Sequence, residues 1–217
     1  MTSGHDKPKP RRWAAAAVLW LAVCAAAAAV AVLGVLSVER LRSPVEIDSA
    51  YVALVVAEAF FLVFLWPFFE RRAGGESFGE VVAGAAARLV GLLFLATPLI
   101  VLATRLCETP PLAVVRSQAM VFLIGVAVAV AVRLPGAVLW YLPAAFLLSA
   151  GVPFASYLLR EECGIPVAWA ATLSPLWASG AAAAGSPSHA SFIVFACLGA
   201  GALLALALSR RGAPEQP

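Results

Sequence analysis

The chain has 217 residues, of which 63% are hydrophobic and 12% charged, and its formal net charge is +3. This composition excludes a water-soluble domain, and lysines and arginines this few and this dispersed exclude a nucleic-acid-binding surface. About 20 apolar residues, at about 1.5 Å rise per residue, cross a hydrocarbon layer of roughly 30 Å. Because the chain holds several such stretches, we predict a polytopic helical membrane protein in a lipid bilayer.

The first apolar stretch runs from Trp13 to Leu36 and follows the basic residues Lys7, Lys9, Arg11 and Arg12. A secretory signal peptide is the alternative interpretation of this N-terminus. The apolar region of a signal peptide is about 7–15 residues long, and the stretch here is longer. We therefore favour an uncleaved first membrane span.

The second and third predicted spans are joined by a short charged loop. The second covers about Ala50 to Phe69 and ends in aromatic residues, which suit the headgroup level of a membrane. The third begins after Ser77, because Ser77-x-x-Glu80 is the pattern of a capping box ahead of an apolar run. It extends to about Thr104, with Pro98 as the expected site of a kink.

Three further apolar stretches follow in the second half of the chain. The fourth predicted span covers about Leu112 to Val132. The fifth starts at Pro135, because proline suits the first turn of a helix, and ends near Leu159. The last covers about Ser191 to Leu208.

One apolar segment, Gly164 to Gly185, fits no simple span because Pro175 lies in its middle. A seventh span would place the two termini on opposite sides of the membrane. We favour a re-entrant or interfacial pair of short helices instead. The predicted fold is therefore all-α: a six-span transmembrane helical bundle with a re-entrant or interfacial helical segment before the last span. It forms one transmembrane domain over residues 13–208, with a disordered cytoplasmic tail at 1–12 and another cytoplasmic tail at 209–217.

The distribution of basic residues predicts the orientation of these six spans. The side that holds both termini receives nine lysines and arginines, and the other side receives five. Cytoplasmic loops are the ones enriched in lysine and arginine. Both termini are therefore expected in the cytoplasm.

Two ionisable residues fall inside predicted spans, where an ionised side chain is costly. Glu58 lies near the middle of the second span and Arg88 about ten residues into the third. Counted from the loop that joins these spans, their depths differ by about 4.5 Å, which an arginine side chain can cover. We predict an intramembrane ion pair between them, which either locks the hairpin or lines a substrate or gating path.

Two further polar residues, Arg116 and Gln118, lie near the outer end of the fourth span. Their side chains are expected to extend to the membrane interface, and a ligand contact is the alternative.

The cysteines leave two alternatives open. Cys107 and Cys163 both fall on the predicted outer side, so they could form a disulfide if that compartment is oxidising. Free thiols are favoured, since the distance between the two residues does not follow from the sequence.

Motifs for catalysis or for metal binding are not found in the sequence. The cysteines and histidines have no metal-binding spacing, and no nucleotide-binding or zinc-protease motif is present. Ser179 and His189 come nearest to a catalytic dyad, but Ser179 lacks the first glycine of an intramembrane serine protease motif. We expect a protein that is not an enzyme and that holds no cofactor and no metal.

Two short sequence motifs, together with the predicted topology, carry a resemblance to a known family. They are Glu70-Arg71-Arg72-Ala73-Gly74-Gly75-Glu76-Ser77, in the first cytoplasmic loop, and Leu173-Ser174-Pro175-Leu176-Trp177, in the broken apolar segment. With six spans and both termini inside, the chain resembles the membrane (permease) subunit of type-2 ABC exporters, including the small permeases of haem export and cytochrome c maturation. The resemblance implies an ATPase-docking loop formed by Glu70, Arg71, Arg72 and Glu76, and a re-entrant element at Ser174 and Pro175.

The same resemblance implies export by alternating access in a bacterial inner (plasma) membrane. Because the chain has no Walker A sequence, a separate ATP-binding subunit would supply the energy, and two permease subunits would surround one pathway as a homo- or hetero-oligomer. The chain departs from the family in having only about ten polar residues before Trp13, where an amphipathic helix is usual. The main alternative is a non-transporting scaffold or subunit of a larger membrane complex, supported by the scarcity of polar residues in the spans.

Overall fold

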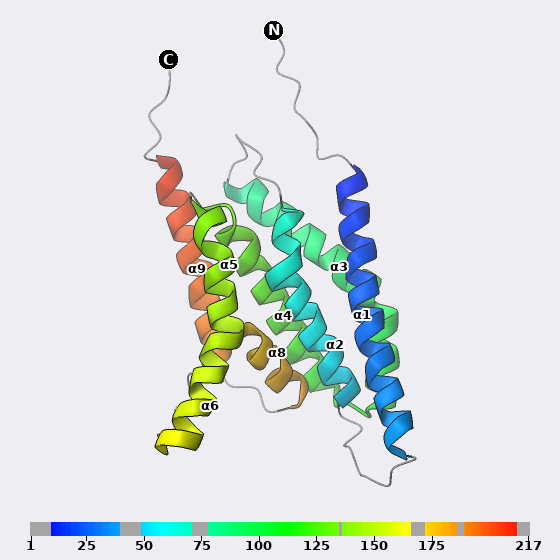
Figure 1. Ribbon diagram of the computed structural model, residues 1–217. Helices are drawn as coiled ribbons and strands as arrows, with labels where there is room; N and C mark the ends of the chain where they lie inside the picture. The colour runs from blue at the N-terminus through cyan, green and yellow to red at the C-terminus, as the bar shows by residue number, and fades with distance from the viewer. Residues whose placement is uncertain are drawn as a thin grey trace.

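The computed structural model describes residues 10–39, 49–70, 78–134, 136–165, 172–185 and 189–211, and every regular element within these ranges is helical. Figure 1 shows the arrangement. The α-helices are α1 (Pro10–Glu39), α2 (Ser49–Phe60), α3 (Phe78–Leu106), α4 (Pro111–Ala131), α5 (Ala137–Phe146), α6 (Val152–Cys163), α8 (Pro175–Ala183) and α9 (His189–Arg211). Three short elements complete the description. The π-helical η1 (Phe61–Leu65) and the 3₁₀-helical η2 (Trp66–Phe68) extend α2, and the π-helical η3 (Leu147–Gly151) joins α5 to α6.

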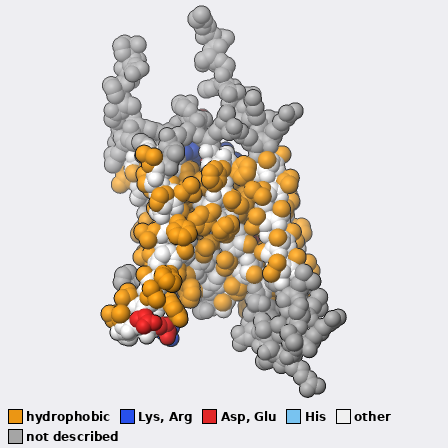
Figure 2. Space-filling model, in the orientation of Figure 1, with side chains coloured by type: hydrophobic (Ala, Val, Ile, Leu, Met, Phe, Trp, Pro, Cys, Tyr) orange, Lys and Arg blue, Asp and Glu red, His pale blue; other side chains and the backbone are white. Residues whose placement is uncertain are grey.

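Long apolar stretches dominate the described helices. Five of them are long and apolar enough to cross a membrane, and a shorter apolar stretch lies in α9. Figure 2 shows hydrophobic side chains over most of the described surface between the two ends of the molecule. The chain is therefore a multi-pass helical membrane protein, which confirms the prediction of class. The five stretches are Trp13–Val30, Ala50–Phe68, Gly79–Leu106, Pro111–Ala131 and Leu139–Cys163, with His189–Ala205 as the shorter one.

Successive long helices run in alternating directions, and Figure 1 shows α1 beginning and α9 ending at the same end of the bundle. We call this the terminal end. Helices α2 and α4 start at the opposite end and run toward the terminal end, whereas α3 starts at the terminal end (Figure 1). This alternation decides which way each side chain leans, because Cα–Cβ bonds in a helix tilt toward its N-terminus.

Helices α2 and α4 form the centre of the bundle. Half of the residues in their apolar windows are buried inside the protein (50% each), compared with 17% in the window of α1. Gly125 on α4 allows close approach of α3, since a Cβ atom there would lie 2.6 Å from Leu89 Cδ2. Small residues at helix contacts serve this purpose in membranes.

The segment α5–η3–α6 separates from the other helices toward its C-terminal end. None of the residues of α6 is buried, and the helix extends away from its neighbours at the opposite end (Figure 1). Its last turn holds Arg160, Glu161 and Glu162. Apolar side chains on the rest of α6 are exposed, including Phe154 and Tyr157.

The boundaries of the helices agree with the predicted spans to within a few residues, with two differences. Helix α2 changes to π and then 3₁₀ geometry at Phe61, and the fifth span is interrupted by η3. Between Gly164 and Gly185 one described helix, α8, has nine residues and is about 14 Å long, too short to cross a bilayer. The predicted N-cap Ser77 and the predicted helix start Pro135 lie outside the described residues, as do most of both predicted tails.

Candidate functional site

The interior of the bundle holds a polar group of side chains between α2 and α4. Glu58 on α2 is fully buried, and Gln118 Nε2 on α4 donates a hydrogen bond to its Oε2 at 2.9 Å. One residue earlier on α4, Ser117 Oγ lies 2.6 Å from the hydroxyl of Tyr51 and donates to Val114 O at 3.0 Å. Tyr51 therefore donates to Ser117, and both hydroxyls are satisfied.

Helical spacing places these residues together. Tyr51 and Glu58 are seven residues apart, which is two turns, so they lie on the same face of α2. Glu58 and Gln118 are the tenth and eighth residues of helices that both start at the opposite end. They are therefore at similar depth, and both side chains lean the same way.

The predicted Glu58–Arg88 ion pair is not formed. Arg88 instead binds Glu70, with Nε at 3.0 Å from Oε1 and Nη2 at 3.1 Å from Oε2. Because α2 and α3 are antiparallel, residues at equal depth lean in opposite directions. The Arg88 guanidinium turns toward the terminal end, where a Cβ atom on Gly84 would lie 3.6 Å from Nη1, whereas Glu58 leans toward the opposite end.

Glu70 forms a buried ionic cluster at the terminal end. Its carboxylate accepts from Arg88 and also lies 2.8 Å from Arg133 Nη2, and only 2% of the side chain is exposed. Arg133 Nη1 also donates to Val81 O at 3.4 Å. The carboxylate of Glu70 is therefore not accessible to an ATPase, unlike the role implied by the resemblance. The other residues of the implied docking loop, Arg71, Arg72 and Glu76, lie outside the described residues.

The two π-helical elements expose carbonyls that other helices bind. Tyr141 on α5 donates its hydroxyl to Val63 O in η1 at 2.8 Å. Ser174 donates to Ser149 O in η3 at 3.2 Å. A π-helical turn disturbs the regular α-helical hydrogen bonds, so interhelical donors of this kind fasten the irregular turns to their neighbours.

Ser174 and Pro175, the predicted re-entrant element, begin α8. Ser174 is the N-cap, and its Oγ accepts from Trp177 N at 3.3 Å, while Pro175 occupies the first turn. Both positions follow the preferences for helix starts. Ser174 is fully buried, so its hydroxyl serves both α8 and the contact with η3.

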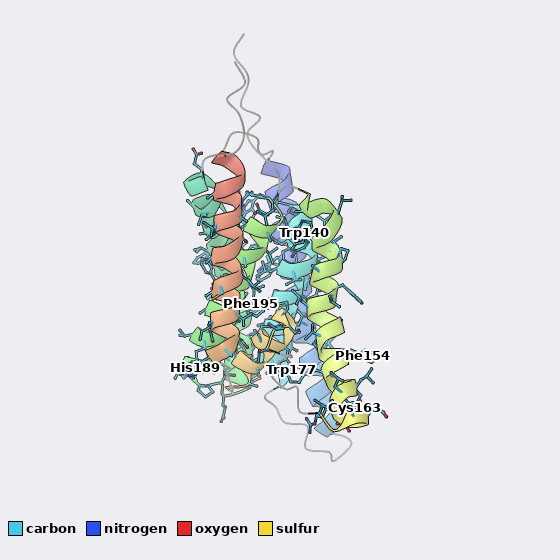
Figure 3. The ribbon with its side chains drawn as sticks, turned by 90° about the vertical axis from the view of Figure 1, so that its left-hand side faces the viewer. Trp140, Phe154, Cys163, Trp177, His189 and Phe195 are labelled. Carbon is cyan, nitrogen blue, oxygen red and sulfur yellow. The ribbon has the colours of Figure 1, made fainter. Side chains whose placement is uncertain are left out.

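Two cavities lie on either side of the start of α8. The first, about 400 Å³, lies between α4, α5, α8 and α9, and we call it the α5–α9 groove. In Figure 3, Trp140 and Phe195 mark two of the helices that border it, with α8 beneath. Its lining is almost wholly apolar and includes Val128, Trp140, Ala144, Pro175, Phe195 and Gly201.

The second cavity is lined by α2, η3, α6 and α8 and measures about 560 Å³; we call it the α2–α8 cavity. Ser149 and Ser174 contribute hydroxyl groups to it. Since Pro175 lines the groove and Ser174 the cavity, the first turn of α8 separates the two spaces.

The remaining candidate residues do not form a site. Cys107 is buried and Cys163 is exposed, and the two do not form a disulfide. Ser179 is buried and donates to Leu176 O at 2.9 Å, while His189 is exposed at the start of α9. Among the described residues, no group of His, Cys, Asp and Glu could hold a metal ion.

Comparison with protein-family models, with characterised proteins and with solved structures finds no match. The fold and the apolar stretches place the chain among multi-span helical membrane proteins. The resemblance to exporter permeases therefore rests on the sequence motifs and the topology, and it is a proposal about function.

Proposed function

We propose that the protein is a membrane permease subunit that binds an apolar or amphipathic compound in the α5–α9 groove. The observation that carries this proposal is the groove itself. Its volume of about 400 Å³ lies in the range of ligand pockets, roughly 300–1,000 Å³, and its lining is apolar, as it is in most such pockets. The groove lies at the side of the bundle, so a ligand with long hydrocarbon parts would enter from the lipid.

The proposed topology has six crossings, with α8 as a re-entrant helix. Helix α9 has 23 residues, or about 34 Å, which is enough for a sixth crossing. Six crossings agree with α1 beginning and α9 ending at the same end (Figure 1). In this proposal the membrane is the inner membrane of a bacterium. The positive-inside rule then gives the terminal end a cytoplasmic location.

Movement of α8 offers a route for transport. Its first turn separates the α5–α9 groove from the α2–α8 cavity, and Ser174 at its start donates a hydrogen bond to Ser149 O in η3. Displacement of this helix would join the two spaces. Alternating access commonly uses discontinuous helices near a substrate site in this way.

A variant that fills the groove tests ligand binding. Gly201 lines the groove, and a Cβ atom there would meet nothing within 4 Å. The change Gly201→Trp should therefore leave the fold intact and lower labelling by a photoactivatable fatty acid several-fold. Leu204→Trp is the matched control, because Leu204 is on the same helix, is 62% exposed and does not line the groove. Equal labelling of the two variants would contradict the proposal.

The energy source in this proposal is a separate ATP-binding subunit docked at the loop of residues 71–77. Reversing the charges of Arg71 and Arg72 together should abolish co-purification of an ATPase from the native host. Capture of the same ATPase by wild type and variant, or of no ATPase by either, would remove the ATP-driven part of the proposal and leave the groove to be judged by its own test.

A scaffold is the second candidate, favoured by α6. This helix buries none of its residues and exposes Phe154, Tyr157 and Leu158, so another membrane protein could pack against it. In that case, polar substitution of these three residues would release a stable complex seen in native mass spectrometry, and Gly201→Trp would have no effect.

A further inference from the structure

Among the buried side-chain atoms of the described residues that have no hydrogen-bond partner, two oxygens belong to one hydrogen-bonded pair. They are Glu58 Oε1 and Gln118 Oε1. The other polar atoms of the two planar groups, Gln118 Nε2 and Glu58 Oε2, are 2.9 Å apart. A buried polar atom without a partner is costly, so the absence of a donor for both oxygens requires an explanation.

We propose that Glu58 and Gln118 form a proton-binding site inside the membrane. The proton comes from water and binds to Glu58 Oε1, which converts the carboxylate to a neutral acid. The acid hydroxyl then donates to Gln118 Oε1, while Gln118 Nε2 continues to donate to Glu58 Oε2. One proton thereby satisfies both oxygens, because an acid and a primary amide can pair through two parallel hydrogen bonds.

The surroundings of Glu58 favour a proton over other ways of neutralising the carboxylate. Arg88, the nearest arginine expected from the sequence, is held by Glu70. Within the described residues, the neighbours of Glu58 are uncharged: Cys24 on α1, Tyr51 on α2 and Gln118 on α4. An ionised carboxylate would therefore be without a counter-charge in an apolar interior.

A metal cation fits this site less well than a proton. A sodium ion needs several oxygen ligands, and the hydroxyls of Tyr51 and Ser117 on the same two helices are already engaged, Tyr51 with Ser117 and Ser117 with Val114 O. The carboxyl and amide oxygens alone would remain for the cation. A proton needs only these two atoms.

This site lies on the interface between the two central helices and is separate from the α5–α9 groove. Loss of the proton would leave a charge between α2 and α4 and would break one of the two hydrogen bonds that join Glu58 to Gln118. The interface should therefore be tighter at low pH than at high pH. Neither cavity is needed for this inference, which holds whether or not the protein is a permease.

Infrared spectroscopy of the full chain in lipid nanodiscs tests the proposal directly. At neutral pH the wild type should show the C=O stretching band of a protonated carboxyl, and this band should be absent from Glu58→Gln. Glu161→Gln is the matched control and should keep the band, because the Glu161 side chain is 50% exposed and lies away from the Glu58–Gln118 pair. A wild-type spectrum with carboxylate bands alone would overturn the proposal.

Thermal unfolding across pH gives a second measurement. Wild-type Tm should fall as the pH rises above the pKa of an ordinary exposed glutamate, because only the folded state then holds the proton, and it should level off once the protonated-carboxyl band is lost. Glu58→Gln should unfold close to the wild-type temperature at low pH and should lose this pH dependence, since its amide can donate where the acid proton did. If Glu58→Gln does not fold, the pH titration of the wild-type band decides the matter. A wild-type Tm raised by sodium but not by potassium, and unchanged by pH, would assign a cation site instead and overturn the proposal.

Discussion

The carboxylate of Glu70 joins three parts of the chain at the terminal end. It binds Arg88 on α3 and Arg133 after α4, and it lies two residues after the end of η2. A buried ion pair is costly to form. Removing one of its two partners costs more, because the other charge then stays buried without a counter-charge. Glu70 therefore holds the terminal end of the bundle together.

The change Glu70→Gln should destabilise the protein by roughly 2–4 kcal/mol, since it removes a buried carboxylate that pairs with Arg88 and Arg133; this range allows for the partial exposure of Arg88. Unfolding in detergent, followed by circular dichroism, would measure the loss. Glu161→Gln is the control, because Glu161 forms an exposed pair with Arg160 at 3.8 Å. A loss of stability no larger than that of the control would show that the cluster does not hold the helices.

For Glu58 and Arg88, the sequence predicts in which span each residue lies but not which side chain it binds. Their position inside apolar stretches was predicted correctly, because hydropathy and length define those stretches. Their partners were not, because partner choice depends on the direction in which each helix leans its side chains and on residues distant in sequence. Gln118 is 60 residues from Glu58, and its amide, like that of any glutamine, fits many environments.

At the scale of the element, the π-helical turns are fixed by tertiary contacts. The turn η1 continues α2 without a proline at its start, and the hydroxyl of Tyr141 binds the carbonyl of Val63 within it. A π-helical turn is less stable than an α-helical one and is most often found as a single turn. The hydrogen bond from α5 therefore stabilises a conformation that α2 by itself does not favour.

Removing this hydroxyl by Tyr141→Phe should cost about 1 kcal/mol, because the carbonyl of Val63 then lies in an apolar interior with fewer donors. Tyr157→Phe on α6 is the matched control, since Tyr157 is 61% exposed, and it should change stability by less than about 0.5 kcal/mol. Denaturant unfolding of both variants in the same detergent would compare them. Equal losses would mean that the Tyr141 hydrogen bond does not stabilise η1.

The sequence predicts the starts of helices better than it predicts their interruptions. The predicted third span begins after Ser77 and α3 begins at Phe78, whereas the capping contact itself stays a prediction because Ser77 lies outside the described residues. Pro175 was recognised as a break in an apolar segment, and α8 begins there with Ser174 as its N-cap. The interruption at η3 was not predicted, because π-helical turns leave no local pattern in the sequence.

At the scale of the whole molecule, topology is the property that a single experiment can test. In a background with Cys163 as the reactive thiol, an impermeant maleimide should label it from one side of sealed vesicles only. In a Cys163→Ser background, Gly79→Cys should be labelled from the other side, since Gly79 lies at the start of α3 and Cys163 at the end of α6 (Figure 1). Labelling of both positions from the same side would contradict the arrangement of five long crossings.

Length and hydropathy alone determined that this chain is a helical bundle in a membrane, because the thickness of the hydrocarbon layer sets the length of every apolar stretch. The residues that each span binds were decided only by tertiary structure. Antiparallel neighbours lean their side chains in opposite directions, so Arg88 reaches Glu70 and Glu58 reaches Gln118. The α5–α9 groove, likewise, exists because α5 and α9 stand apart over α4, and no local pattern in the sequence describes that separation.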